Sequence, residues 1–114
     1  MLLQEQERTA LMARLYRGFA DGSRLSILQA LDEGGGLTVT EIVERTGLGQ
    51  SNASNHLACL RECGLVRAEQ QGRYVRYDLA DDRVQELLRL AESLLEEIGG
   101  KIYACTRYRS ADAV

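Results

Sequence analysis

The feature that most constrains this fold is a pair of short helical segments joined by a glycine turn. Apolar residues recur at helical spacing over residues 41–46, with Ile42 and Val43 inward, and again over 51–63. Gly47-Leu48-Gly49 lies between the two segments and suits a tight turn. Two short helices joined by a glycine-containing turn are typical of a helix-turn-helix.

A hairpin follows this helical pair directly. Residues 66–70 and 73–79 carry strand-favouring side chains such as Tyr74 and Val75, and Gln71-Gly72 between them suits a two-residue loop. A hairpin after a helix-turn-helix is a wing, and the combination is far more specific than either part. The sequence therefore predicts a mostly α fold with a small β-hairpin, a winged helix-turn-helix.

Helices are also expected before and after this motif. The first covers about residues 4–20, and the second begins after Asp21-Gly22 and ends at Gly34-Gly35-Gly36. The last begins near Asp81 or Asp82, and Gly99-Gly100 is expected to stop it. The chain then divides into a winged helix-turn-helix and dimerisation domain, 1–100, and a polar tail, 101–114.

Small polar residues indicate where the internal helices begin. Ser23 is the expected N-cap of the second helix, Thr38 or Thr40 that of the third, and Ser51 that of the fourth. The hydroxyl of such a residue accepts a hydrogen bond from a backbone N–H that has no partner inside the helix.

An apolar stripe on the last helix predicts a homodimer. Apolar residues recur along residues 84–98 over two heptads, more than one small domain can cover, so we expect this helix to pair with the first helix in a two-fold dimer. The residues expected at this interface are Leu11, Leu15, Leu87, Leu94 and Ile98.

The charge distribution favours a nucleic-acid partner for the middle of the chain. The 114 residues carry a net charge of −3, yet residues 51–76 carry +2 and residues 77–100 carry −5. A polyanion responds to the local field more than to the total charge. We therefore expect double-stranded DNA to bind at the helix-turn-helix and its wing.

The recognition helix and the wing supply the expected DNA contacts. Short polar side chains at the N-terminus of a recognition helix reach base edges, and arginines on a wing suit phosphates or the minor groove. His56 is expected to pack or to contact a phosphate, with metal ligation as the alternative. The predicted DNA-binding residues are Ser51, Asn52, Ser54, Asn55, His56, Arg73 and Arg76.

Composition excludes several other classes. No apolar run is long enough to span a bilayer, and no signal-peptide pattern is present, so a cytoplasmic protein without a membrane partner is expected. His56 is the only histidine, and the triple glycine at 34–36 lacks the lysine of a phosphate-binding loop. An enzyme is therefore not expected, nor is an organic cofactor.

Three cysteines suggest a site for a soft metal ion. Cys59 and Cys63 lie one helical turn apart on the recognition helix, so both thiols can approach one cation. Cys105 can complete a trigonal set if the tail folds back, from the same chain or from the partner. Thiolates prefer soft ions over Mg²⁺ or Ca²⁺. A helical cysteine pair alone is more typical of small buried apolar side chains, and the third cysteine in a polar tail is what favours a metal site.

These motifs together resemble the ArsR/SmtB family of metal-sensing repressors. The run Ser51-Asn52-Ala53-Ser54-Asn55-His56-Leu57 looks like that family's recognition helix, and Gly72-Arg73-Tyr74-Val75-Arg76-Tyr77 looks like its wing. The resemblance covers about residues 16–98. The cysteine pair with a third cysteine in the tail is similar to the cadmium- and lead-sensing branch of the family.

The resemblance implies a homodimeric repressor that leaves its operator DNA on binding Cd(II) or Pb(II) through Cys59, Cys63 and Cys105. Arsenic- and zinc-sensing branches carry ligands that this chain lacks, since residues 40–46 hold no cysteine and the last helix holds no histidine. Two alternatives stay open: a thiol-based redox-sensing repressor on the same fold, and a metal-independent DNA-binding module.

Overall fold

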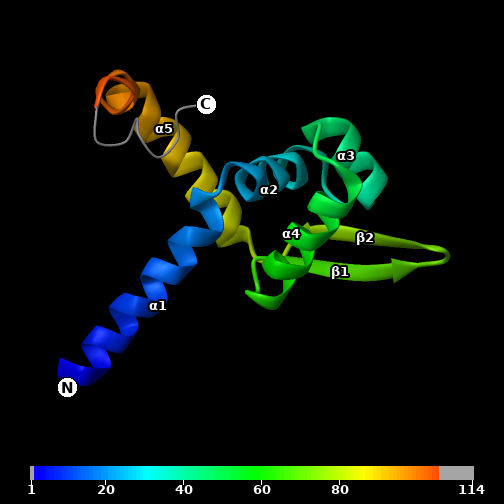
Figure 1. The fold of residues 1–114 in the computed structure, drawn as a ribbon, viewed down its shortest axis with the longest axis horizontal. Coiled ribbons are helices and arrows are strands. Elements are labelled where there is room, and N and C mark those ends of the chain that lie inside the picture. Colours follow the sequence, from blue (N-terminus) through cyan, green and yellow to red (C-terminus); the bar gives the residue numbers. More distant parts are fainter. Residues whose placement is uncertain (1, 106–114) are drawn as a thin grey trace. The chain divides into compact units, whose positions relative to one another are not determined.

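Within the residues that the structure describes, the chain folds into five helices and one hairpin in the predicted order. The computed structural model describes residues 2–105. The elements are α1 (Leu2–Ala20), α2 (Gly22–Gly34), α3 (Val39–Thr46), α4 (Gln50–Glu62), β1 (Val66–Gln71), β2 (Tyr74–Leu79) and α5 (Asp82–Ala104) (Figure 1). The mostly α fold with a two-stranded wing is confirmed.

Two compact units make up the chain. The first, Met1–Asp82, holds α1 to α4 and the hairpin, and the second begins at Arg83 and holds the rest of α5. No helix within residues 2–105 has the length and apolar character needed to cross a bilayer.

The core of the first unit forms where α2, α3 and α4 pack together. Apolar side chains at i, i+3 and i+4 spacing point inward from each helix, and their removal from water is the main stabilising contribution. The largest side chains that are fully buried are Ile27, Leu28, Leu31, Ile42, Leu57, Leu60 and Val66.

The hairpin is antiparallel and two-stranded. Gln71 pairs with Tyr74 and Val66 with Leu79, so the loop between the strands is Gly72-Arg73. The predicted loop, Gln71-Gly72, is therefore wrong by one residue. Gly72 has φ +61°, which suits the first position of a type II′ turn, where glycine is preferred.

Three of the predicted helix boundaries are wrong. Asp21, and not Ser23, caps α2, since its carboxylate accepts the Arg24 N–H at 3.0 Å. Gly49 stands at the N-cap of α4, with Ser51 inside the first turn. The helix α5 continues through Gly99-Gly100 to Ala104, because neither glycine takes the left-handed conformation that terminates a helix. The predicted tail thus begins as helix, and residues 106–114 lie outside the described residues.

A capping box starts α3. The Thr38 hydroxyl accepts the Glu41 N–H at 3.3 Å, and the Glu41 carboxylate accepts the Thr38 N–H at 3.0 Å. The sequence left Thr38 and Thr40 as alternatives, and the structure assigns the cap to Thr38.

Thr38→Ala should therefore destabilise the protein, while Thr40→Ala should not. Loss of an N-cap hydroxyl costs about 1 kcal/mol of unfolding free energy. Thr40 is exposed within α3 and makes no part of the capping box, so it serves as the matched control. Urea unfolding monitored by circular dichroism measures both. An equal loss of stability in the two variants would contradict the assignment.

Candidate nucleic-acid and metal site

The recognition helix α4 presents its polar start to solvent. Burial of Ala53 and Leu57, at 0% and 1% exposure, fixes the inward face of the helix. The polar residues on either side of Ala53 point outward, so the predicted DNA contacts at the helix start are exposed: Ser51, Asn52, Ser54 and Asn55. Short polar groups around exposed backbone N–H groups at a helix N-terminus suit base edges and phosphates.

His56 is half-buried on α4 and lies near the start of α2. The pKa of Asp21 is lowered chiefly by the Arg24 backbone hydrogen bond, and to a smaller extent by the charges of Arg24 and His56. This neighbourhood favours a packing role for His56 over ligation.

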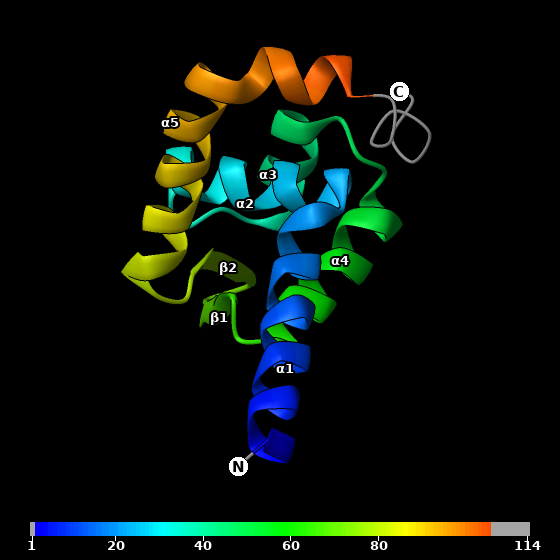
Figure 2. The same ribbon diagram turned by 90° about the vertical axis from the view of Figure 1, so that its left-hand side faces the viewer.

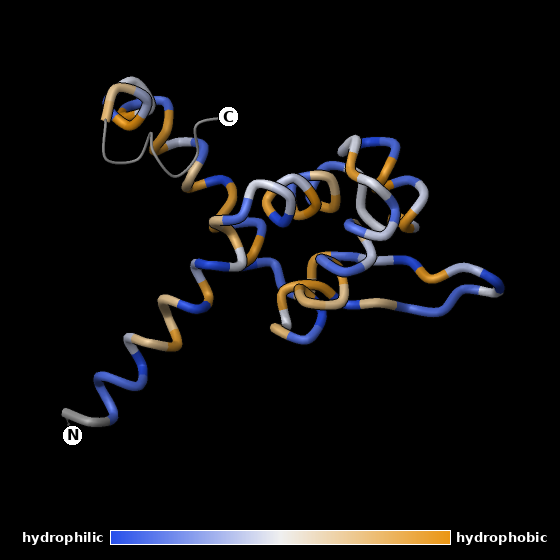
Figure 3. The backbone as a smooth tube through the Cα atoms, viewed as in Figure 1, coloured by the Kyte–Doolittle hydropathy of each residue, from blue (hydrophilic) through white to orange (hydrophobic). Residues whose placement is uncertain are grey.

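The two wing arginines have different surroundings. Arg73 is exposed in the hairpin loop, where the tube in Figure 3 is coloured hydrophilic. Arg76 is half-buried in β2, where its Nη1 donates to the Gly36 carbonyl at 2.6 Å and lies 3.4 Å from Glu41 Oε1. Of the two, Arg73 is the exposed one, and the DNA contacts of both stay a prediction.

The cysteine pair lies at the other end of α4. Cys59 and Cys63 are exposed free thiols one turn apart, and Cys63 N–H donates to the Cys59 carbonyl at 3.0 Å. Partial burial of its sulfur raises the pKa of Cys63, and so do the charge of Cys59 and a side-chain hydrogen bond with it. The two thiols thus interact with one another.

The third predicted ligand belongs to the second unit. Cys105 is half-buried just after α5, and its N–H donates to the Ile102 carbonyl at 3.1 Å. Within residues 2–105, no group of three or more His, Cys, Asp or Glu side chains lies in an arrangement that holds a metal. Cys59 and Cys63 lie together in the first unit, and the ligand role of Cys105 stays a prediction.

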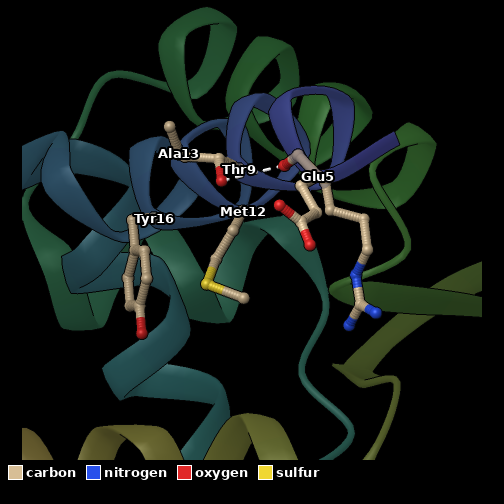
Figure 4. A pocket seen from close by; sticks show the side chains of 6 residues that line it. Glu5, Thr9, Met12, Ala13 and Tyr16 are labelled. Atoms are coloured by element: carbon tan, nitrogen blue, oxygen red, sulfur yellow. Dashed lines mark hydrogen bonds between the residues drawn. The ribbon is translucent and has the colours of Figure 1, made fainter. Parts of the chain in front are cut away.

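The residues predicted for dimerisation are accessible to different degrees. Leu11 is 61% exposed, Leu15 40% and Leu94 53%, while Leu87 and Ile98 are half-buried. Met12 and Tyr16 add further exposed apolar surface to α1, and Figure 4 shows both pointing from the same side of that helix as Glu5. Exposure on this scale leaves apolar surface for a partner chain to cover.

Sequence reasoning missed the polar residues that fasten the wing to the helices. Asp78 accepts the Gly36 N–H at 2.7 Å, and Glu41 faces Arg76. The pattern Thr38-x-x-Glu41 was a readable signal for the capping box, but no local pattern indicates a contact between residues 36 and 78.

The fold and the exposed face of α4 define a winged helix-turn-helix DNA-binding protein. Residues 21–68 match the model of the bacterial regulatory protein ArsR family. The chain belongs to this family, whose members are transcriptional regulators and not enzymes. The predicted family resemblance is confirmed.

Two sequence relatives are transcriptional regulators. The chain is 48% identical over 88 residues to the transcriptional regulator CmtR of Mycobacterium tuberculosis, covering 77% of this chain and 73% of CmtR. It is 40% identical over 95 residues to a probable mercury resistance operon repressor of Streptomyces lividans, covering 83% and 75%.

Solved structures agree with these relatives. The NMR structure of CmtR, described as a cadmium metal-sensor, matches with TM-score 0.57 and 49% identity over 64% of this chain and 74% of that one. The homodimeric winged helix-turn-helix domain of Mb0332 from Mycobacterium bovis matches with TM-score 0.74 and 31% identity over 82% and 86%.

The raised pKa of Cys63 predicts a measurable titration. The pH midpoint of iodoacetamide alkylation of Cys63 should be higher in the folded protein than in urea, because fewer thiolates form at a given pH. Cys59→Ser should lower that midpoint by removing a neighbouring charge. Peptide mass spectrometry after timed alkylation measures Cys63 separately. A midpoint unaffected by folding and by Cys59→Ser would contradict the contact between the thiols.

Proposed function

We propose that this protein is a homodimeric repressor that binds operator DNA and releases it on binding Cd(II) or Pb(II). The observation that carries the proposal is the position of Cys59 and Cys63 on the helix whose other end is expected to read DNA. The similarity to CmtR, a cadmium metal-sensor, supports the metal, and the homodimeric neighbour supports the assembly. This function places the protein in the cytoplasm, where thiols stay reduced.

The polar start of α4 and the tip of the wing form the proposed DNA surface. Ser51, Asn52, Ser54 and Asn55 would enter the major groove, and Arg73 would meet phosphate or the minor groove. In a two-fold dimer the two recognition helices meet half-sites about one helical turn apart, roughly 34–36 Å. Dimerisation through α1 and α5 would set that separation.

Three thiolates are the proposed ligands. Cys59 and Cys63 would bind from α4, and Cys105 would complete the set from the partner subunit, which links the ion to the geometry of the dimer. Three thiolates with one divalent ion leave a net charge of −1 beside the DNA-reading helix. The negative charge beside the recognition helix and the change in dimer geometry both oppose binding to a polyanion.

A mobility-shift assay tests the proposed function. The probe is a 30-base-pair duplex that the wild-type protein selects from a randomised pool, called here the selected duplex. We expect Cd(II) and Pb(II) to release it and Zn(II) to act more weakly. Release by peroxide and not by cadmium would favour the redox-sensing alternative, for which the adjacent Cys59 and Cys63 thiols are suited. No salt-dependent binding to any duplex would overturn the repressor function.

Substitutions should separate affinity from specificity. Arg73→Ala should weaken binding to all duplexes and lower the slope of log affinity against log salt by about one, because one phosphate contact is lost. Ser54→Ala or Asn55→Ala should weaken binding to the selected duplex more than to a scrambled one of equal composition. Fluorescence anisotropy over a salt series measures both quantities. An unchanged slope in Arg73→Ala would contradict the phosphate contact.

Mixed dimers test whether Cys105 binds across the subunits. In dimers of one Cys59→Ser and one Cys105→Ser subunit, ligation across subunits leaves one complete three-thiolate site. The thiolate-to-metal absorption should then appear at half the wild-type amplitude. Ligation within one chain leaves no complete site, and the three-thiolate absorption would be absent. The Cys105→Ser homodimer should still bind the selected duplex but respond poorly to Cd(II); normal release would remove Cys105 from the mechanism.

A further inference from the structure

Three consecutive residues of β2 form hydrogen bonds with the loop that precedes α3. Arg76 Nη1 donates to the Gly36 carbonyl at 2.6 Å, and Asp78 Oδ1 accepts the Gly36 N–H at 2.7 Å. Between them, Tyr77 exchanges two backbone hydrogen bonds with Leu37, at 2.7 and 3.0 Å. Both polar groups of Gly36 and both of Leu37 are thus held by β2.

The same arginine also reaches the first turn of α3. Glu41 Oε1 accepts from the Thr38 N–H and hydroxyl, each at 3.0 Å, and lies 3.4 Å from Arg76 Nη1. These contacts lower the pKa of Glu41, chiefly through the Thr38 hydrogen bonds and further through the charge of Arg76. Arg76 therefore joins the wing to the capping box of the helix-turn-helix.

The loop of residues 35–37, which lies between α2 and α3, has little conformational freedom. Gly35 and Gly36 have φ near +60°, a conformation that other residues adopt only with strain. Leu37, directly after them, is 3% exposed in the core. A contact from β2 to this loop consequently fixes the wing relative to α3, and α3 packs on α4.

We propose that Arg76 is a positioning residue for DNA recognition, which holds the wing at the angle that lets Arg73 and the start of α4 engage one duplex together. The proposal rests on the proposed DNA binding. The Arg76 guanidinium is directed at Gly36 and Glu41, and the Glu41 carboxylate offsets part of its positive charge. Arg73, three residues earlier and exposed in the loop, is the wing arginine that contacts DNA.

The opposing role, a direct phosphate contact by Arg76, makes different predictions. A phosphate contact contributes about one unit to the salt slope and acts equally on all sequences. A positioning residue acts most on the duplex whose contacts need the correct geometry, so its loss lowers the affinity for the selected duplex more than the affinity for a scrambled one. Glu41→Gln separates the two further, since glutamine keeps the capping box but loses the ion pair. Removal of an acidic charge favours DNA binding on electrostatic grounds alone, whereas loss of positioning weakens it.

The experiment compares wild type, Arg76→Ala, Glu41→Gln and, as the matched control, Arg73→Ala. Anisotropy titrations over a salt series use the selected duplex and its scrambled counterpart. We expect Arg76→Ala and Glu41→Gln to lower the ratio of the affinities for the selected and the scrambled duplex about tenfold, or about 1.4 kcal/mol. Arg73→Ala should lower the slope and keep the ratio.

Two results of the binding titrations would overturn the positioning role. One is an Arg76→Ala slope lowered by about one with an unchanged affinity ratio; the other is a Glu41→Gln variant that binds the selected duplex as tightly as wild type or more tightly. Circular dichroism melting confirms that each variant folds, and amide exchange at Leu37 and Tyr77 reports the wing contact directly. Exchange at wild-type rates in Arg76→Ala would also contradict the role. Absence of duplex binding by the wild type would instead overturn the proposed function.

Discussion

Burial of one face of α4 is the constraint on which the rest of this molecule depends. Ala53, Leu57 and Leu60 are almost fully removed from water, at 0–1% exposure, and this sets the rotation of the helix about its axis. With that rotation fixed, the polar residues of the first turn and the two cysteines of the last turns must all face outward. Apolar packing thereby determines which chemistry the helix presents. Figure 2 shows α4 and its neighbours in the view turned by 90°.

The same helix links the two proposed binding events. A charge placed at Cys59 and Cys63 lies on a rigid element whose other end would contact bases, so ion and DNA need not touch to influence one another. The wing takes part because β2 is fastened to the loop before α3 through Arg76, Tyr77 and Asp78. We infer that the recognition helix and the wing move as one rigid DNA-binding unit. A change in the separation of the two such units of a dimer would weaken the DNA contacts of both subunits at once.

Periodicity predicted most of the fold, because the apolar spacing that a buried helix face requires is visible locally. The ends of the helices were harder to predict from the sequence. Whether Asp21 or Ser23 caps α2 depends on the backbone path between α1 and α2, and both residue types make good caps. Gly99-Gly100 weakens α5 by about 1 kcal/mol per residue relative to alanine, yet ends a helix only in the left-handed conformation.

The site was predicted in the same uneven way. The outward direction of Ser54, Asn55 and the two α4 cysteines follows from helix geometry. The surroundings of Arg76 do not, since Gly36 is 40 residues away in the chain and only the folded wing brings them together. The ligand role of Cys105 stays a prediction for a related reason: the proposed co-ligands, Cys59 and Cys63, lie in a different unit, and no local sequence pattern relates the two units.

The most direct test of the central claim is a comparison of Cd(II) affinity for the free protein and for its complex with DNA. If metal and DNA oppose one another through α4, each must weaken the other by the same factor. The account predicts that Cd(II), measured by competition with a chelator, binds the DNA complex at least about tenfold more weakly than the free protein. Equal affinities for the two forms would contradict the proposed coupling.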